Sequence, residues 1–487
     1  MGVVTINLQS GFFFYLLVIY TNTEKCLIFK NISIFFSQEY YFKTYLLKIQ
    51  KFLFEMDIMP VSANILVLSD GSTAKVTDSL NGSGYALTSS TYDEFQSILE
   101  ANAMFDLAIV IAPSGGFDEK NNSLDILSDK NLPILVVGDN PNPSEIQSVP
   151  ENFCDLEIKR RIQSLIRLQI MKQELARRSA TISLYGFTEK DLSQIPTSEE
   201  KKNILLVGSH SEILGDILLQ LERRCKVDVC RVADNAVDEL RSGSFDAVLM
   251  LGAGQGDVHF RLCTDLRTDS RLFNMPVLFV LENESNREAA YIHGASDIIM
   301  HPTEMTNLYT RTSLHIQQSE YRFSLQKLFK ESKPLPVTDG LTSLYSFGFV
   351  QAHMAKLIDD HQEQGKHLSI ASITVNNMEE INSEYGYPAG DQVLRQIGTI
   401  ISYMVRGEDF CGRYKGNQFV VALPSTCKEE AFIALKRVYG VTRNTEFAIA
   451  AIAKPVTAII NMGLDEMASG DSFDDIVIRG SKRGFSN

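Results

Sequence analysis

Short apolar runs alternate with polar and amphipathic stretches over much of the chain, and the same order of runs occurs twice. The runs that predict buried strands are 65–68, 107–111 and 134–137 in the first half of the pattern, and 204–207, 247–251 and 277–280 in the second. Strands that alternate with helix-length segments form parallel sheets covered by helices. Each half therefore predicts a doubly wound α/β domain, and together they form an internal repeat.

Each half ends in a longer amphipathic pattern, which predicts a helix over 158–178 in the first and over 305–329 in the second. With 487 residues the chain has room for about three domains of ordinary size. We place the domains at 59–185, 200–332 and 335–487.

The first 58 residues differ from the rest, because Phe, Tyr, Ile, Asn and Lys crowd them. Their longest apolar run, 11–20, is much shorter than the roughly 20 residues that span a membrane. We expect a misassigned or disordered extension before a true start at Met56 or Met59; a short interfacial anchor is the alternative.

Charge and cysteine content exclude some classes of protein. The formal net charge of −14 argues against a nucleic-acid partner, which requires clustered Lys and Arg. The seven cysteines are scattered without Cys-x-x-Cys spacing, which indicates neither a disulfide framework nor a zinc site. We expect a protein of the reducing cytoplasm without a membrane span.

Both halves of the repeat resemble response-regulator receiver domains. The first strands read Asn-Ile-Leu-Val-Leu (64–68) and Asn-Ile-Leu-Leu-Val (203–207), and the third strands begin Phe-Asp-Leu-Ala-Ile-Val and Phe-Asp-Ala-Val-Leu-Met. The resemblance implies two flavodoxin-like folds. It also implies a Mg²⁺ site made of an acidic pair, a phospho-accepting Asp and a Lys.

Most of these receiver residues are replaced. The corresponding positions are Ser69, Asp70, Ile111 or Ala112, and the region of Cys154 in the first copy, and Gly208, Ser209, Leu251 and His301 in the second. Hard Mg²⁺ needs anionic oxygens. We therefore expect that neither copy is phosphorylated through this site, and we interpret Asp70 and His301 as structural residues.

The last third resembles the GGDEF domain of diguanylate cyclases at three places in the right order. These are Thr-Asp-Gly-Leu-Thr-Ser-Leu (338–344), Asn-Ser-Glu-Tyr-Gly-Tyr-Pro-Ala-Gly-Asp (382–391) and the hairpin region 406–419. The positions at which the family has its metal-binding carboxylates correspond to Thr374, Asn376 and Asn417, which are neutral. We therefore predict no catalytic residue, no bound metal and no enzymatic activity.

Arg406 and Asp409 match the Arg-x-x-Asp site at which the family binds its product, cyclic di-GMP. A planar guanidinium can bond a guanine edge or a phosphate through two N–H groups, and Asp can accept from guanine. Arg437, on the following helix, corresponds to a further ligand contact. The alternatives are an exposed ion pair for Arg406 and Asp409 and a solvated helix face for Arg437.

Asn382 and Asp391 match the base-contacting residues of the family, which implies a remnant guanine-binding site that could take GTP. The alternative is that both are turn and cap residues.

Two receiver-like domains before a GGDEF-like domain resemble the PleD-like and PopA-like response regulators. The resemblance implies a cyclic di-GMP effector without a required cofactor, which dimerises through its receiver domains and binds protease adaptors or cell-cycle regulators, in the cytoplasm and at the cell pole. A GTP-binding sensor and a ligand-independent dimeric scaffold are the alternatives.

Overall fold

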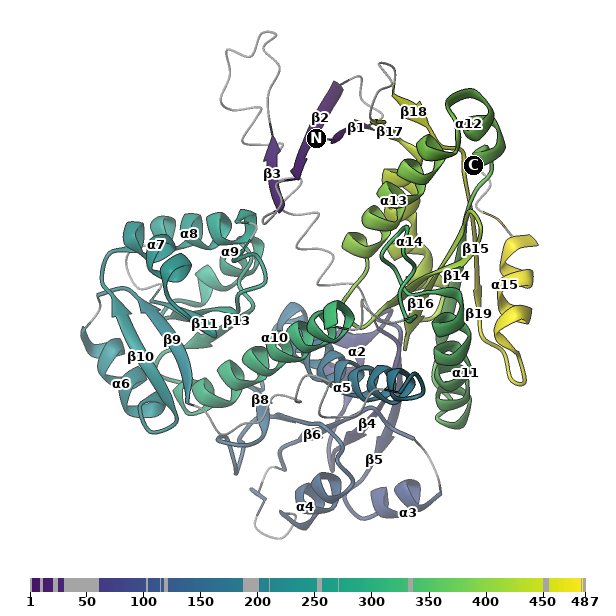
Figure 1. Cartoon of the computed structure of the whole chain (residues 1–487). Helices are drawn as coiled ribbons and strands as arrows, with labels where there is room; N and C mark the ends of the chain where they lie inside the picture. The colour runs from purple at the N-terminus through teal and green to yellow at the C-terminus, as the bar shows by residue number, and fades with distance from the viewer. Residues whose placement is uncertain are drawn as a thin grey trace.

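The computed structural model describes residues 61–101, 104–113, 115–117, 121–186, 201–209, 211–251, 256–269, 271–331, 336–449, 455–482 and 484, together with three strands near the N-terminus. Two parallel sheets and one larger antiparallel unit are arranged around a pair of long helices (Figure 1). We refer to these units as the first, second and third modules.

The first module is a five-stranded parallel sheet in the order β5-β4-β6-β7-β8. Its strands are β4 (Ala63–Leu68), β5 (Tyr85–Ser90), β6 (Leu107–Ile111), β7 (Ile134–Val137) and β8 (Gln147–Val149). Its helices are α2 (Ala74–Leu80), α3 (Phe95–Glu100), α4 (Asn121–Asp129) and the 29-residue α5 (Asp155–Ser183). The central strands are apolar and buried over most of their length because helices cover both faces of the sheet.

The second module repeats this order as β10-β9-β11-β12-β13. Its strands are β9 (Lys202–Val207), β10 (Cys225–Cys230), β11 (Ala247–Leu251), β12 (Val277–Leu281) and β13 (Asp297–Met300). Its helices are α6 (Ser211–Leu221), α7 (Ala233–Ser242), α8 (Gly256–Thr268), α9 (Arg287–Ile292) and α10 (Leu308–Glu331), with short 3₁₀ turns at Glu284–Asn286 and Met305–Asn307. Both modules therefore have the doubly wound strand order predicted from the repeat, and all six predicted strands and both predicted long helices are confirmed.

The third module has an antiparallel sheet in the order β15-β16-β14-β19. Its strands are β14 (Leu368–Val375), β15 (Phe410–Lys415), β16 (Gln418–Pro424) and β19 (Ile460–Glu466). The helices are α11 (Phe347–Glu363), α12 (Met378–Tyr385), α13 (Tyr387–Met404), α14 (Lys428–Arg443) and α15 (Phe473–Lys482).

A further antiparallel sheet joins the N-terminal strands to the third module, in the order β18-β17-β1-β2-β3. Its strands are β1 (Gly2–Leu8), β2 (Phe12–Tyr20), β3 (Lys25–Phe29), β17 (Thr445–Phe447) and β18 (Val456–Thr457). Apart from β1, β2 and β3, the predicted extension 1–58 lies outside the described residues. The prediction of a later start stays a prediction.

The long helices α5 and α10 connect the modules, since they pack on each other and both reach the third module (Figure 1). Met171, Leu175 and Ile182 of α5, with Leu325 and Leu328 of α10, belong to the same buried cluster as Tyr345 and Phe349 of the third module. Burial of each such side chain stabilises the interface by roughly 1.5–3 kcal/mol. The third module therefore packs against α5 and α10, the last helices of the two α/β modules.

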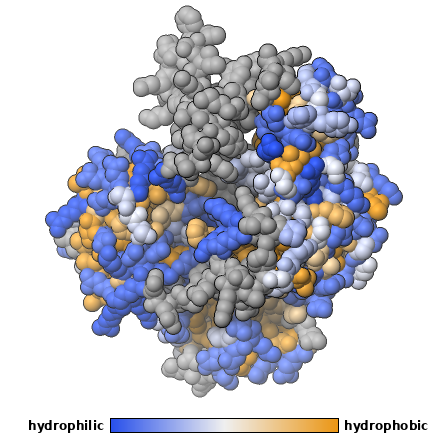
Figure 2. Space-filling view, viewed as in Figure 1, coloured by the Kyte–Doolittle hydropathy of each residue, from blue (hydrophilic) through white to orange (hydrophobic). Residues whose placement is uncertain are grey.

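The visible surface of the modules is mostly hydrophilic, with apolar residues scattered among the polar ones (Figure 2). Within the part of the chain that the structure describes, none of the helices combines the length and apolarity needed to cross a membrane.

Candidate functional site

The Arg406–Asp409 segment forms a tight turn between α13 and β15. The Arg406 backbone N–H donates to Asp409 Oδ2 at 2.9 Å, and the Asp409 N–H donates to the Arg406 carbonyl at 3.2 Å. Only 7% of Arg406 and 5% of Asp409 is exposed. The alternative that these residues form an exposed ion pair is therefore wrong.

Helix α5 of the first module covers this turn. Arg167 Nε donates to Glu408 Oε1 at 2.7 Å, and Glu408 is 1% exposed. Arg178 Nη2 donates to the Asp409 carbonyl at 2.8 Å and to the Glu408 carbonyl at 3.3 Å. Two arginines from a helix more than 200 residues earlier thus fix the backbone and the central acid of the turn.

A fully buried carboxylate on α5, Glu174, orients Arg178 and the neighbouring Arg177. It accepts from Arg178 Nε at 2.6 Å, Arg177 Nη1 at 2.5 Å and His353 Nε2 of α11 at 3.0 Å. Burial alone would raise the pKa of Glu174, but the neighbouring charges of Arg178, His353 and Arg177 outweigh it and bring the pKa below its usual range. Burial lowers the pKa of His353 despite the Glu174 charge. The network connects α5, α11 and the turn through charge-assisted bonds.

The two acids of the turn have pKa values shifted in opposite directions. Burial raises the pKa of Asp409 to about 6; the Arg406 charge opposes this and the Glu408 charge adds to it. For Glu408, burial also raises the pKa, but Arg167 outweighs burial and the pKa is lowered. Burial lowers the pKa of Arg406, against the charge of Asp409. Asp409 is therefore the acid of this turn that titrates near neutrality.

Arg437 lies on α14, which packs beside α13, and it is half-buried rather than on a fully solvated helix face. Its helix thus neighbours the one that leads into the turn.

Asn382 and Asp391 lie on either side of the α12–α13 junction. The Asn382 carbonyl accepts from Gly386 N–H at 2.9 Å, where Gly386 has φ +83°, so Asn382 also has a role in the turn. Among the described residues, Asn382 Oδ1 is buried without a hydrogen-bond partner, and a Cβ at Gly390 would lie 2.0 Å from it. Asp391 is exposed.

The hairpin between β15 and β16 brings the predicted metal positions together. Thr374 lies opposite Gln418 in the sheet, and Asn417 Nδ2 donates to the Val375 carbonyl at 2.6 Å. The Lys415 ammonium lies 4.6 Å from the centre of the Tyr414 ring. Across the described ranges, no group of three or more His, Cys, Asp or Glu side chains is arranged to hold a metal ion. The side chains at these positions are a hydroxyl and two amides, where the family resemblance implies carboxylates.

Sequence reasoning missed Arg167, Glu174, Arg178, Glu408 and His353. The three residues on α5 look like an ordinary charged helix face, and Glu408 is one of the two variable positions inside the Arg-x-x-Asp motif. The available signal for these residues was the high density of charged side chains on α5, a helix that also carries an apolar stripe.

The third module matches a known family model. Residues 337–480 match the family model for the diguanylate cyclase GGDEF domain. The chain is also homologous to the response regulator PleD of Caulobacter vibrioides, with 23% identity over 335 residues that cover 68% of this chain and 72% of PleD. The diguanylate cyclase DosC of Escherichia coli is 28% identical over 127 residues, 26% of this chain and 28% of DosC.

Two solved structures are similar to part of this chain, with TM-scores well below 0.5. The GGDEF domain of DgcB from Caulobacter crescentus in complex with c-di-GMP has 20% identity and a TM-score of 0.29, and covers 30% of this chain and 86% of that one. Diguanylate cyclase SiaD in complex with its activator SiaC, from Pseudomonas aeruginosa, has 22% identity and a TM-score of 0.30, and covers 36% and 69%.

The comparisons correct the prediction that this protein is not an enzyme. The matched family model is that of diguanylate cyclases, and DosC is itself named a diguanylate cyclase. The prediction rested on neutral residues at Thr374, Asn376 and Asn417. Neutral residues at these positions do not exclude catalysis, because proteins often hold Mg²⁺ through only one or two carboxylates together with substrate phosphates and water.

Proposed function

We propose that this chain is a cyclic di-GMP signalling protein in which the ligand binds at the Arg406–Asp409 turn and changes how the third module docks on α5. The observation that carries the proposal is the coupling of the turn to α5 through Arg167 and Arg178. The match of residues 337–480 to the diguanylate cyclase family supports cyclic di-GMP as the ligand.

The burial of the turn sets how such a ligand would act. Arg406 and Asp409 are both buried while the third module packs against α5. A ligand that bonds their side chains must therefore bind an arrangement in which the third module has moved away from α5. A ligand shifts an equilibrium only by its differential affinity for the two states, and its apparent affinity falls with the fraction of competent molecules. Weakening the contact between α5 and the turn should therefore tighten cyclic di-GMP binding.

Isothermal titration of cyclic di-GMP into the full chain tests this. We expect binding by the wild type, loss of binding in Arg406→Ala, and no change in Arg443→Ala, which removes an exposed arginine of α14. Arg167→Met, which removes the Glu408 partner, should bind more tightly than the wild type. Unchanged binding in Arg406→Ala would contradict the proposal.

GTP, titrated separately, distinguishes the alternatives. Binding of GTP alone, lost in Asn382→Ala or Asp391→Ala, would indicate a nucleotide sensor, and binding of neither nucleotide would indicate a scaffold. Conversion of GTP to cyclic di-GMP in the same samples measures turnover directly.

The proposal extends to a PopA-like scaffold that needs no cofactor besides its ligand. It would dimerise through receiver-like first and second modules and bind protease adaptors or cell-cycle regulators, with localisation to the cell pole. The sequence resemblance supports this part. Ligand-dependent changes in mass by light scattering, and in localisation of a fluorescent fusion, would test it.

A further inference from the structure

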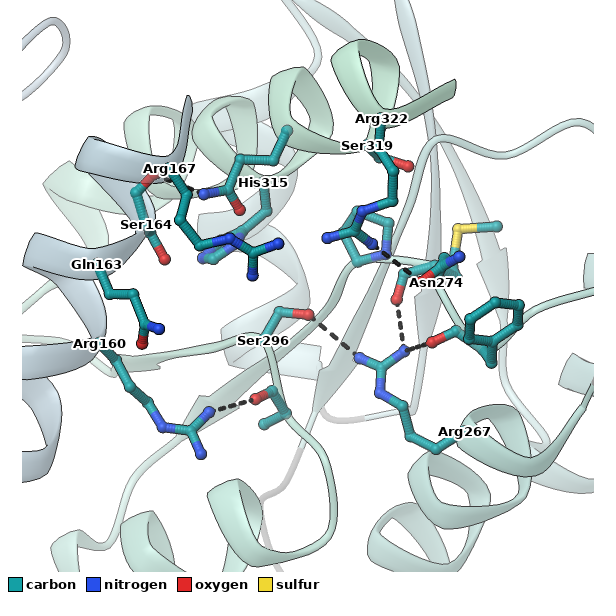
Figure 3. Close-up of a pocket in the computed structure, with 15 residues that line it drawn as sticks. Arg160, Gln163, Ser164, Arg167, Arg267, Asn274, Ser296, His315, Ser319 and Arg322 are labelled. Carbon is teal, nitrogen blue, oxygen red and sulfur yellow. Dashed lines mark hydrogen bonds between the residues drawn. The ribbon is translucent and has the colours of Figure 1, made fainter. Parts of the chain in front are cut away.

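A cleft lies between α5 of the first module and the second module (Figure 3). It is lined by α5, by α10, by Arg267 at the end of α8, and by the segments that lead into β12 and β13 of the second module. The empty space between these segments is about 690 Å³ when the adjoining open solvent is included. No residue of the cleft belongs to the turn or to the hairpin.

The lining is strongly basic. It contains four arginines and a histidine, and among the described residues that line it none is acidic: Arg160, Arg167, Arg267, Arg322 and His315. The whole chain, in contrast, carries a net charge of −14. Two acidic residues outside the lining pair with residues that line the cleft: Glu408 with Arg167 at 2.7 Å, and Asp297 with His315 at 3.5 Å. A concentration of one charge between low-dielectric walls attracts the opposite charge.

The arginines have different structural roles. Arg267 is a brace, because it donates to the carbonyls of Gly294, Phe273 and Met275 and to Ser296 Oγ at 2.7–3.1 Å. Arg160 and Arg322 enter from α5 and α10 on opposite sides of the cleft, and each contacts a neutral oxygen, of Ala295 at 3.5 Å and Asn274 at 2.9 Å (Figure 3). Arg160, Arg322 and Arg167 are not part of this brace, and they reach the cleft from α5 and α10.

We propose that this cleft binds a small ligand with two or more linked phosphate groups, held by Arg160, Arg167 and Arg322. Arginine suits phosphate because its fork donates two parallel N–H bonds to an anionic group, and three arginines from two helices match a diphosphate better than a single charge.

Binding in the cleft would reach the turn through two contacts. A phosphate on Arg167 competes with Glu408 for the same guanidinium, and Arg322 Cγ lies 3.3 Å from the position a Cβ would take on Gly407. The ligand would therefore loosen the hold of α5 on the turn. The site itself stands apart from the cyclic di-GMP proposal, and only this effect on the turn rests on that proposal.

Isothermal titration of pyrophosphate, and separately of ATP, into the full chain tests the site, since neither carries the guanine that the third module is proposed to bind. We expect binding by the wild type and at least a tenfold loss in the Arg160→Gln/Arg322→Gln double variant. Arg241→Gln, an exposed arginine of α7 paired with Asp269, should bind like the wild type. Binding of both probes would assign the affinity to the diphosphate itself, and binding of ATP alone to a nucleotide.

Thermal melts of each variant establish that it is folded. Failure of the folded wild type to bind either probe, or equal binding by the double variant, would overturn the site. The link to the turn has its own test, because Glu408→Gln removes the competing carboxylate and should tighten pyrophosphate binding several-fold. Unchanged affinity there would overturn the link, whereas loss of cyclic di-GMP binding in Arg406→Ala would be unaffected by either result.

Discussion

Replacing Arg178 by Met tests how strongly α5 holds the turn. The Arg178 side chain is buried, donates to Glu174 and to the Asp409 carbonyl, and has its guanidinium carbon 5.8 Å from the ring centres of both Tyr345 and Phe410. Methionine keeps much of the length and the packing but removes the charge and every donor. The variant therefore isolates the polar part of the contact.

The expected cost follows from the partners left behind. Removing one member of a buried ion pair costs about 3–5 kcal/mol, because the other charge stays buried. Glu174 keeps Arg177 and His353, so we expect a loss near the lower limit, about 3 kcal/mol in the free energy of unfolding.

Urea unfolding followed by far-UV circular dichroism measures this loss, since the chain has no Trp to serve as a fluorescent probe. Hydrogen exchange at 406–412 should quicken in parallel, because two turn carbonyls lose their donor. Gln173→Met is the matched control, as it places the same side chain at an exposed position on the same helix. A loss below about 1 kcal/mol, or the same loss in the control, would refute the reasoning.

Three other changes follow from the same contacts. The pKa of Asp409 is raised from 3.8 to about 6, so its protonated form stabilises the fold below pH 3.8, and this contribution is lost as the pH rises through about 6. In pH-dependent melts the wild type should therefore lose stability over that window relative to Asp409→Asn. Parallel curves for the two proteins would contradict this. Gly463→Ala would put a Cβ 2.6 Å from the backbone of α15 and should lower the free energy of unfolding by about 1–3 kcal/mol. Gly440→Ala, which has open space around it in helix α14, should raise the free energy of unfolding by roughly 0.5–1 kcal/mol. Equal melting temperatures of the two variants would contradict the close approach at Gly463. Arg311→Leu removes a fully buried guanidinium that donates to the Ser148 carbonyl across the two α/β modules, and it should lower the melting temperature and expand the molecule in small-angle scattering.

The central strands could be predicted from sequence because burial on both faces makes them continuously apolar. The edge strands could not. In β5 the inward and outward positions give a mixed pattern, and β8 is only three residues long and includes the polar Gln147 and Ser148. Those two side chains are buried because they bond Thr310 and Asn307 of the second module, a contact that no local pattern contains.

The position of the turn could also be predicted, since motif spacing fixes Arg406 and Asp409 relative to the hairpin. Its burial could not, because the partner of Glu408 lies 241 residues away on α5. In the sequence, Glu174 and Arg178 have the i, i+4 spacing of a solvated helix pair, and only the docking of the third module turns them into a buried network.

Helix α5 carries two sets of buried charges, one for each neighbouring module. Toward its start, Arg161 pairs with Asp297 at 2.9 Å and Glu157 with Arg287 at 2.6 Å, both on the second module. Further along, Arg167 and Arg178 hold the turn of the third. Arg161 and Arg167 are only about 9 Å apart along the helix axis at 1.5 Å per residue, so a rotation or shift of α5 would change both sets together. Breaking either set of buried ion pairs is costly, so we expect a displacement of α5 at the second module to be felt at the turn.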